Sequence, residues 1–224
     1  MSLADLLYPR KCPFCACLLP EEEPGDICPA CRRDLPWTRG GGKTKGSFFS
    51  LCVSPLTYAG KAREALLRFK FRGRRAYARC FGRLMADCVR ENVPWELHTV
   101  SYVPLHWLRF RKRGYSQSRL LARAVAAELG LPCAPLLRKT RAVRPLSGMG
   151  AGDRRRAAVS GAFAFRPSAE GAAAGKNVLL TDDVVISGAT LSECSRVLLT
   201  AGAERVVCVT LCRPAEGGKQ GFVC

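Results

Sequence analysis

Apolar and polar residues alternate in two different ways along this chain, and the alternation predicts most of its elements. Four segments have the helical spacing of apolar side chains or end in a helix-terminating glycine. They cover about residues 61–71, 77–91, 116–130 and 191–202. Four apolar runs, typical of strands, cover residues 48–58, 98–105, 177–185 and 205–212. This order of strands and helices predicts an α/β fold in which helices flank a parallel sheet.

The segment VLLTDDVVISGAT, residues 178–190, joins a strand to a helix and carries the strongest candidate chemistry. Its first three residues form an apolar run, as expected of a strand buried on both faces of a parallel sheet. Ligands of such sheets bind beyond the carboxyl ends of the strands, which is where Asp182 and Asp183 fall. These two carboxylates are therefore candidate ligand-binding groups.

The five residues that lead into the next helix are Ile186, Ser187, Gly188, Ala189 and Thr190. The glycine permits close approach of a backbone, two side chains offer hydroxyl groups, and the N–H groups of a helix start attract phosphate. Thr190 and Glu193 also have the spacing of a capping box, which would make this an ordinary helix start. A capping box explains the threonine, but it does not explain the adjacent aspartates.

Two CxxC pairs, Cys12 with Cys15 and Cys28 with Cys31, stand near the N-terminus. Each spacer lets two thiolates point at one ion, and two pairs complete the tetrahedral four-sulfur site of structural zinc, which has no open position for water. Such a metal would stabilise this N-terminal segment, which has too few core residues to fold alone. Cys17 is an alternative ligand to Cys15, and free or redox-active thiols are the other interpretation.

A glycine-rich basic stretch, RGGGKTKGS at residues 39–47, follows the cysteines and has the composition of a linker. It predicts a zinc-ribbon module at residues 1–38, a linker at 39–50 and the α/β domain at 51–224. The stretch contains a Gly-Lys-Thr triplet that resembles the end of a Walker A loop. That loop also needs glycine where this chain has Trp37, with a strand leading into it, so we reject a P-loop.

The chain is strongly basic, with 36 Lys and Arg against 18 Asp and Glu and a formal net charge of +18. This excess of positive charge favours polyanions or phosphorylated small molecules as partners. A basic surface with no specific ligand is the alternative interpretation of the same charge. Thirteen cysteines is an odd number, and no signal-peptide pattern opens the chain, so we expect a reducing, cytoplasmic environment. No apolar run approaches the roughly 18 residues of a membrane span, so we expect no membrane insertion.

VLLTDDVVISGAT resembles the phosphoribosyl-pyrophosphate motif of type I phosphoribosyltransferases, and specifically that of the ComF family. Four further stretches and the leading four-cysteine module carry the same resemblance. The stretches are residues 58–73, Val103-Pro104-Leu105-His106, Arg113-Gly114-Tyr115-Ser116-Gln117 and Gly161-Ala162-Phe163. The resemblance covers nearly the whole chain and implies a type I phosphoribosyltransferase-like domain behind a zinc ribbon.

The resemblance also implies a role for each candidate residue. Asp182 and Asp183 would meet the 2′- and 3′-hydroxyls of ribose and, as catalytic residues, would stabilise the positive charge that grows as pyrophosphate leaves. Residues 186–190 would cradle the 5′-phosphate. The implied pyrophosphate contacts are Leu105, His106, Arg109 and Arg113, with Mg²⁺ bridging the pyrophosphate oxygens. For His106, an ordinary structural role as a hydrogen-bonded side chain is an equally good interpretation.

Four positions depart from the family's pattern. Ile186 stands where threonine is common, and Ser116 stands where asparagine is common. Ser147 and Ala158 occupy places where glutamine and asparagine are expected. With these changes the backbone can still cradle a phosphate. The resemblance does not extend as far to catalytic turnover, because the changed positions fall where a mobile, site-closing loop would act.

Basic residues cluster around residues 68–79, 109–123 and 138–156, with aromatic residues among them. This mixture suits single-stranded nucleic acid, whose phosphates bind cations and whose bases stack on rings, although a pyrophosphate site also needs basic groups. Three hypotheses follow. The chain is a Mg²⁺-dependent phosphoribosyltransferase, or, as the family implies, a DNA-uptake factor that binds phosphoribosyl pyrophosphate or single-stranded DNA without turnover. In the third, it is a zinc-organised adaptor that recruits a helicase or another uptake protein.

Overall fold

The computed structural model describes residues 10–20, 25–107, 110–111, 114–141 and 157–215. Its strands are β1 (Leu51–Val53), β2 (Leu56–Thr57), β3 (Thr99–Tyr102), β4 (Leu137–Lys139), β5 (Phe163–Phe165), β6 (Asn177–Val184) and β7 (Arg205–Arg213). Its longer helices are α3 (Gly60–Phe71), α4 (Tyr77–Asn92), α6 (Gln117–Leu129) and α8 (Ala189–Thr200). Shorter helical segments are α2 (Pro29–Asp34), η1 (Arg39–Gly42) and η2 (Pro167–Ala169).

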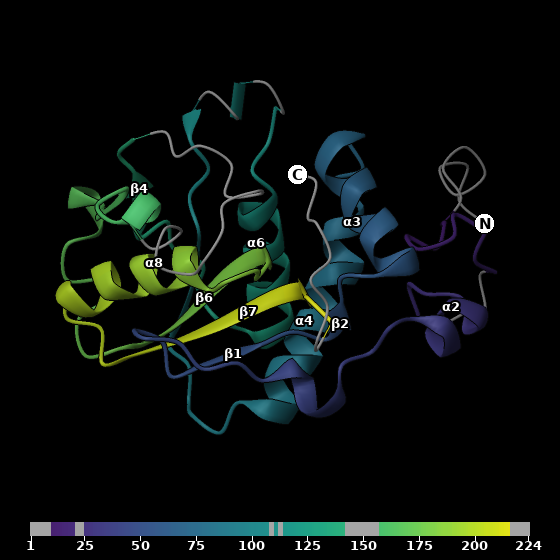
Figure 1. Cartoon of the computed structure of the whole chain (residues 1–224), viewed down its shortest axis with the longest axis horizontal. Coiled ribbons are helices and arrows are strands. Elements are labelled where there is room, and N and C mark those ends of the chain that lie inside the picture. The colour runs from purple at the N-terminus through teal and green to yellow at the C-terminus, as the bar shows by residue number, and fades with distance from the viewer. Residues whose placement is uncertain (1–9, 21–24, 108–109, 112–113, 142–156, 216–224) are drawn as a thin grey trace.

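Five strands form one parallel sheet (Figure 1). β7 pairs with β6 on one side and with β1 and β2 on the other, and β3 pairs with β6 at the edge. Tyr102 lies opposite Thr181, and Asp182 lies opposite Thr210, so the carboxyl ends of β3, β6 and β7 meet at one edge of the sheet. The predicted parallel, helix-flanked sheet is confirmed.

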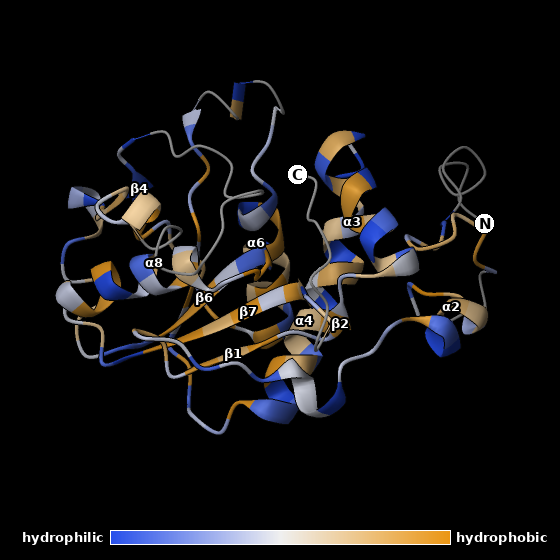
Figure 2. Cartoon of the chain, in the orientation of Figure 1, coloured by the Kyte–Doolittle hydropathy of each residue, from blue (hydrophilic) through white to orange (hydrophobic). Residues whose placement is uncertain are grey.

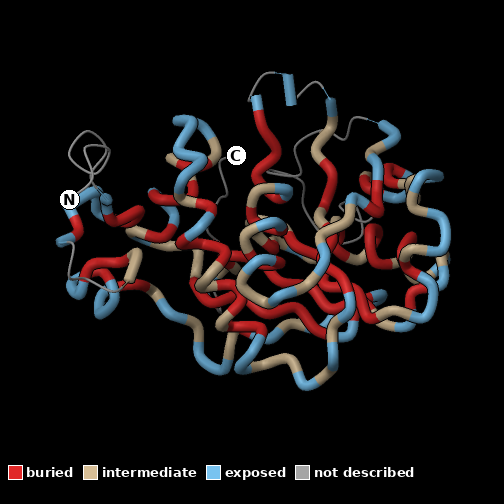
Figure 3. Tube along the Cα trace, turned by 180° about the vertical axis from the view of Figure 1, so that it is seen from behind, coloured by how far each residue is buried: buried red, intermediate tan, exposed pale blue. Residues whose placement is uncertain are grey.

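Helices cover both faces of this sheet, which explains the apolar run in β6. Leu179 belongs to a core cluster that α3, α4 and α6 complete, whereas Val178 and Leu180 belong to a second cluster formed with α8. Successive side chains of a strand point to opposite faces, so a strand between two layers needs apolar residues at every position. The strands are accordingly hydrophobic in Figure 2 and buried in Figure 3. Each fully buried Leu or Val side chain contributes about 1.5–3 kcal/mol.

Helix α6 begins and ends where local signals predict. Ser116 Oγ accepts a hydrogen bond from the N–H of Arg119 at 3.4 Å, which caps the first turn. Gly130, with φ of 68°, ends the helix in the left-handed conformation that glycine adopts at little cost. Within the described ranges, no helix combines the length and the apolar character that crossing a membrane requires.

The predicted capping box at the start of α8 is wrong. The N-cap is Gly188, and no side chain caps this helix end. Glu193 instead accepts a hydrogen bond from the N–H of Gly161 at 2.7 Å and pairs with Arg196 at 2.8 Å. The glutamate therefore ties α8 to the segment before β5, because a long-range donor competes successfully for its carboxylate.

A small second sheet was not predicted from the sequence. β4 and β5 form an antiparallel pair, and β5 packs against α8. Phe163 of β5 is buried in the cluster that also contains Val178 and Leu180. Each of these strands has three residues, which is too short for an alternating pattern to be recognised.

The predicted linker lies along the sheet. Thr44 forms an antiparallel bridge with Cys52 of β1, and the N–H of Ser54 donates to the carbonyl of Gly41 at 2.8 Å. These contacts attach the glycine-rich stretch to the edge of the parallel sheet. The module boundaries at residues 38 and 50 remain predictions.

Candidate functional site

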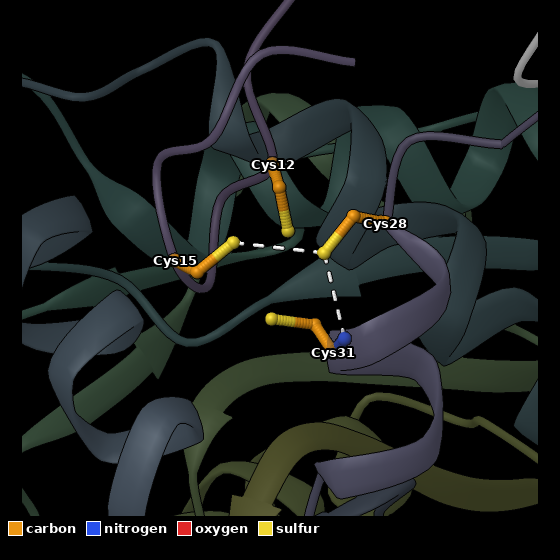
Figure 4. Close-up of side chains that lie close together, drawn as sticks. All are labelled: Cys12, Cys15, Cys28 and Cys31. Atoms are coloured by element: carbon orange, nitrogen blue, oxygen red, sulfur yellow. Dashed lines mark hydrogen bonds between the residues drawn. The ribbon is translucent and has the colours of Figure 1, made fainter. Parts of the chain in front are cut away.

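The four predicted cysteine ligands converge on one point (Figure 4). The Sγ atoms of Cys12, Cys15, Cys28 and Cys31 all lie within 4.8 Å of one another. Cys28 is the N-cap of α2 and accepts a hydrogen bond from the N–H of Cys31 at 3.4 Å, which fixes the second pair. A tetrahedral ion with Zn–S bonds of about 2.3 Å needs sulfurs about 3.8 Å apart. Cys15 and Cys28 have their Sγ atoms 3.6 Å apart, so this donor set fits a structural zinc ion.

Cys17 lies beside this cluster without belonging to the four-sulfur group. Its Sγ is 3.2 Å from that of Cys15, and its side chain is exposed. All twelve cysteines in the described ranges are free thiols. The arrangement therefore favours the two CxxC pairs as the ligand set over a set that includes Cys17.

The four-cysteine segment shares its core with the α/β domain. Phe14, inside the first CxxC pair, is 1% exposed, and its ring centroid lies 5.7 Å from that of Phe81 in α4. Arg68 of α3 donates from Nη2 to the carbonyls of Pro13 and Phe14, at 3.0 and 2.8 Å. The metal segment is therefore docked on α3 and α4 through both apolar contacts and hydrogen bonds.

Asp182 and Asp183 lie near the carboxyl end of β6, where β3 and β7 also end. Because the strand continues through Val184, their side chains point to opposite faces of the sheet. Asp182 Oδ1 accepts a hydrogen bond from the N–H of Asp183 at 2.9 Å. The two carboxyl groups therefore meet different neighbours although the residues are adjacent.

The two aspartates also differ electrostatically. The pKa of Asp182 is raised to about 7, first because its carboxyl group is buried and second because the negative charge of Asp183 lies nearby. The N–H of Asp183 and the ammonium groups of Lys70 and Lys139 act in the opposite direction. A carboxyl group with a strongly raised pKa at the ligand-bearing edge of a sheet is a functional-site candidate.

Lys70 belongs to this site although its sequence position did not predict that role. Its Nζ lies 2.9 Å from Asp183 Oδ1, and the two side chains are 11% and 14% exposed. In the sequence, this lysine stands in a basic stretch near the predicted end of a helix. That position is a weak signal, because the acid it meets depends on how α3 packs against β6.

Four residues of the 186–190 loop line a cavity together with Asp182, Val184, Val185 and Leu191; they are Ile186, Ser187, Gly188 and Thr190. Gly188 has φ of 70°, a conformation that other residues rarely adopt, so this turn requires glycine. The first N–H groups of α8 have no partners within the helix and are suited to an anion. Loop, helix start and carboxyl group are thus brought together in one place.

A second cavity shares Ser187 and Gly188 with the first. Its wall also includes Thr44, Lys45, Gly46, Ser47 and Phe49 of the predicted linker and Ala189 and Ser192 of α8. The glycine-rich basic stretch therefore borders the loop of residues 186–190. This stretch was predicted to be a linker and not a part of the site.

The predicted pyrophosphate loop starts beside the acidic pair. The N–H of Val103 donates to the carbonyl of Thr181 at 3.0 Å, directly after β3. Leu105 and His106 follow and are both half-buried, and the imidazole ring lies 6.0 Å from the ring of Trp107. β3 and β6 thus bring the two loops to the same edge of the sheet.

Some predicted site residues cannot be located in the same way. Arg109, Arg113 and Ser147, which departs from the family pattern, lie outside the described residues.

Ser116, which replaces an asparagine of the family pattern, caps α6, a role that asparagine also fills. The change at this position therefore leaves the local structure intact.

Only part of the predicted aromatic and basic surface is accessible. Phe71, Trp107 and Phe110 are 53%, 57% and 45% exposed, and the guanidinium carbon of Arg111 lies 5.7 Å from the centroid of a Trp107 ring. In contrast, Phe69 and Tyr115 are buried, as are other aromatic rings that pack on α4. Among the aromatic residues of this predicted surface, the exposed side chains are thus those near the end of α3 and after β3.

Two family models match the chain. The phosphoribosyl transferase domain matches residues 116–221, and the double zinc ribbon domain matches residues 3–42. The glutamine phosphoribosylpyrophosphate amidotransferase of B. subtilis, solved with ADP and GMP, is 20% identical with a TM-score of 0.43, over 64% of this chain and 30% of that one. The adenine phosphoribosyltransferase of Leishmania tarentolae is 16% identical with a TM-score of 0.40, over 75% and 79% of the two chains.

The parallel sheet, the four-cysteine cluster and the two family matches define a protein of the phosphoribosyltransferase fold with an N-terminal zinc ribbon. The DNA utilization protein YhgH of Salmonella typhimurium is 30% identical over 210 residues, which cover 90% of this chain and 83% of that protein. Competence protein F of Haemophilus influenzae is 29% identical over 147 residues, which is 62% of each chain. The chain belongs to the ComF family, which includes these relatives.

Proposed function

We propose that this protein binds phosphoribosyl pyrophosphate at the carboxyl edge of its sheet and acts in the uptake or utilization of DNA. The observation that carries the proposal is the cavity at the end of β6, which Asp182 lines together with residues of the glycine turn. The relatives' names, competence protein F and DNA utilization protein, support the cellular role.

The chemistry of each group suits this ligand. Ionised carboxylates accept protons from ribose hydroxyls in hydrogen bonds, and Asp182 and Asp183 would also stabilise positive charge on the ribose. The loop of residues 186–190 and the first turn of α8 would hold the 5′-phosphate. Leu105, His106, Arg109 and Arg113 would contact the pyrophosphate. Mg²⁺, when bound, would bridge pyrophosphate oxygens, since this ion binds through substrate phosphates.

Calorimetric titration with phosphoribosyl pyrophosphate, with and without Mg²⁺, tests the proposal. Replacing Asp182→Asn together with Asp183→Asn should weaken binding by about 100-fold or more, since hydrogen bonds to charged groups contribute about 1.5–3 kcal/mol each. The matched control is Asp87→Asn, an exposed acid paired with Arg90 on α4. Unchanged affinity in a folded double variant would reject the site.

Turnover is a separate question within the same proposal. A phosphoribosyltransferase releases pyrophosphate when an acceptor attacks the anomeric carbon, so release in the presence of candidate acceptors identifies the enzyme. Ile186 lacks the hydroxyl that the family's threonine offers to the phosphate. Restoring it with Ile186→Thr should tighten binding if the loop holds the 5′-phosphate, and unchanged binding would argue against that role.

Single-stranded DNA is the second proposed ligand. The net charge of +18 and the exposed rings of Phe71, Trp107 and Phe110 supply cations for phosphates and faces for stacking. Affinity should then fall steeply with salt, because each neutralised phosphate releases counterions. Trp107→Ala should weaken binding by about 1–3 kcal/mol. Affinity that is independent of salt and of this tryptophan would remove DNA from the proposal.

An adaptor role is the alternative, and one observation favours it. The zinc-ribbon end exposes two large apolar side chains, Leu18 at 61% and Trp37 at 41%. We propose that a helicase or another uptake protein would dock there. Leu18→Glu should abolish capture of that helicase and leave phosphoribosyl pyrophosphate binding unchanged. Deleting the module is a poor test, because Phe14 belongs to the shared core.

A further inference from the structure

The ion pair between Lys70 and Asp183 joins a helix end to the acidic pair of β6. The distance from Nζ to Oδ1 is 2.9 Å, and both side chains are more than four-fifths buried. An ion pair in such a position is screened by salt far less than an exposed one. It therefore holds the carboxylate in a defined orientation.

The end of α3 that carries Lys70 is held by two side chains at the start of α6, one just before the helix and one in its first turn. Tyr115 Oη donates to the carbonyl of Phe69, and Gln117 Nε2 donates to the carbonyl of Lys70 at 3.3 Å. The last carbonyls of a helix have no partners within it, so these bonds satisfy groups that would otherwise need water. The guanidinium carbon of Arg75 also lies 4.8 Å from the centroid of the Tyr115 ring.

The same helix is held on its other side by the zinc ribbon. Arg68, two residues before the lysine, donates to the carbonyls of Pro13 and Phe14. Phe69 between them is fully buried, with its ring centroid 5.5 Å from that of Phe81. The backbone that presents the ammonium group is thus held by the zinc ribbon, by α4 and by the start of α6, as a functional constellation on a rigid element requires.

A cation is a favourable neighbour for two adjacent carboxyl groups. A like charge nearby disfavours the charged form of a carboxyl group, and an opposite charge within about 4–6 Å favours it. Charged or titratable groups act on this pair from every layer around it. They are Lys70 of α3, Lys139 of β4, and the thiols of Cys52 in β1, Cys194 in α8 and Cys208 and Cys212 in β7. Burial, with a smaller contribution from the nearby aspartates, raises the pKa values of these four thiols, so they stay neutral.

We infer that Lys70 is a positioning residue of the ligand site, which holds the Asp183 carboxylate in one orientation. The charge of the same ammonium group opposes the rise in the pKa of Asp182. An ionised carboxylate accepts a hydrogen bond from a ribose hydroxyl, and a protonated one donates. The binding part of this inference rests on the proposed function.

The test uses the full zinc-bound chain with Lys70→Met, Lys70→Arg and the matched control Lys61→Met. Lys61 lies on the same helix and pairs at 3.0 Å with Asp34, but this pair is exposed and belongs to the zinc-ribbon side. Carboxyl ¹³C signals of the aspartates are followed against pH in the ligand-free protein. Affinity for phosphoribosyl pyrophosphate is measured between pH 6 and pH 9.

In Lys70→Met, we expect the titration of Asp182 to move to higher pH, because the positive charge that opposes the rise in its pKa is lost. Affinity at pH 7 should fall at least tenfold, because the Asp183 carboxylate loses the group that orients it. Lys70→Arg should keep the titration and most of the affinity, since the guanidinium group preserves the charge. Lys61→Met should change neither measurement.

The outcomes separate this inference from the proposed function. A shifted carboxyl titration in a protein that does not bind phosphoribosyl pyrophosphate supports the positioning role and rejects the ligand. A carboxyl titration that does not move in Lys70→Met overturns the inference. If affinity falls in that case, the lysine is a direct ligand contact; if affinity stays the same, the lysine has no role in the site. A Lys70→Met chain that does not fold also overturns it, because the lysine would then hold the fold itself.

Discussion

The carboxyl group of Asp182 lies where burial and a neighbouring negative charge both oppose its ionisation. Ionising it in the folded protein therefore costs more free energy than in the unfolded chain. Such a residue destabilises the fold at neutral pH, and it is the kind of feature that a binding site retains for function.

Asp182→Asn should remove this cost. The unfolded chain releases this proton near the ordinary value of 3.8, whereas the folded protein holds it up to about pH 7. Between these values the folded state binds more protons, so raising the pH lowers the free energy of unfolding, and the effect levels off above pH 7. We expect the variant to be more stable than the wild type by about 1–3 kcal/mol at pH 8, and by much less at pH 4.

Urea unfolding of both proteins at several pH values measures this difference. Asp87→Asn on α4 is the control, and it should leave the pH dependence unchanged. A stability difference that stays constant from pH 4 to pH 8 would show that Asp182 titrates normally.

Among the elements, α4 and α6 approach each other closely at Gly82. A Cβ atom at this position would lie 2.3 Å from the Cβ of Ala124 in α6, a distance that real Cβ atoms do not reach. The glycine is thus required by helix packing, although glycine weakens a helix by about 1 kcal/mol. The close approach helps to place α6, and with it Gln117, against the end of α3.

Gly82→Ala should destabilise the protein by about 1–3 kcal/mol despite the better helix propensity of alanine, because overpacking forces the helices apart. Adding Ala124→Gly removes the other methyl group and should recover most of the loss. Chemical unfolding of the two single variants and the double variant measures the coupling. Strictly additive effects would contradict a direct contact.

Local signals predicted some elements fully and others not at all. Ser116 and Gly130 mark the ends of α6 correctly, because capping is a property of the helix end itself. Thr190 and Glu193 have an equally good local pattern, but the glutamate bonds to Gly161 instead. The difference is tertiary: a distant N–H group is brought to Glu193 only when β5 packs on α8.

At the scale of the whole molecule, the zinc ribbon is not an independent appendage. Its buried side chains belong to the same cluster as those of α3 and α4; they are Phe14, Leu19, Ile27 and Leu35. Arg68 adds hydrogen bonds to the first CxxC pair. Loss of the metal is therefore expected to weaken the α/β domain as well as the ribbon.

Metal analysis should give about one zinc per chain, and chelation should lower the midpoint of a single thermal transition, because binding energy of a structural zinc is folding energy. Cys28→Ser should lose the metal and reproduce this loss of stability. Cys17→Ser is the matched control and should keep both. A metal-free chain that remains folded, or a Cys17→Ser variant without zinc, would contradict the four-ligand assignment.

The sequence by itself determined the features that depend on residues close to one another along the chain. These are the two CxxC pairs, the strand that carries Asp182 and Asp183, the glycine turn after it and the alternation that produces a parallel sheet. Only the tertiary structure decided that Lys70 meets Asp183, that the linker borders the loop of residues 186–190 and that Arg68 holds the zinc ribbon. Periodicity shows which face of an element is buried. It carries no information on which distant element that face will contact, and these contacts set the charges of the site.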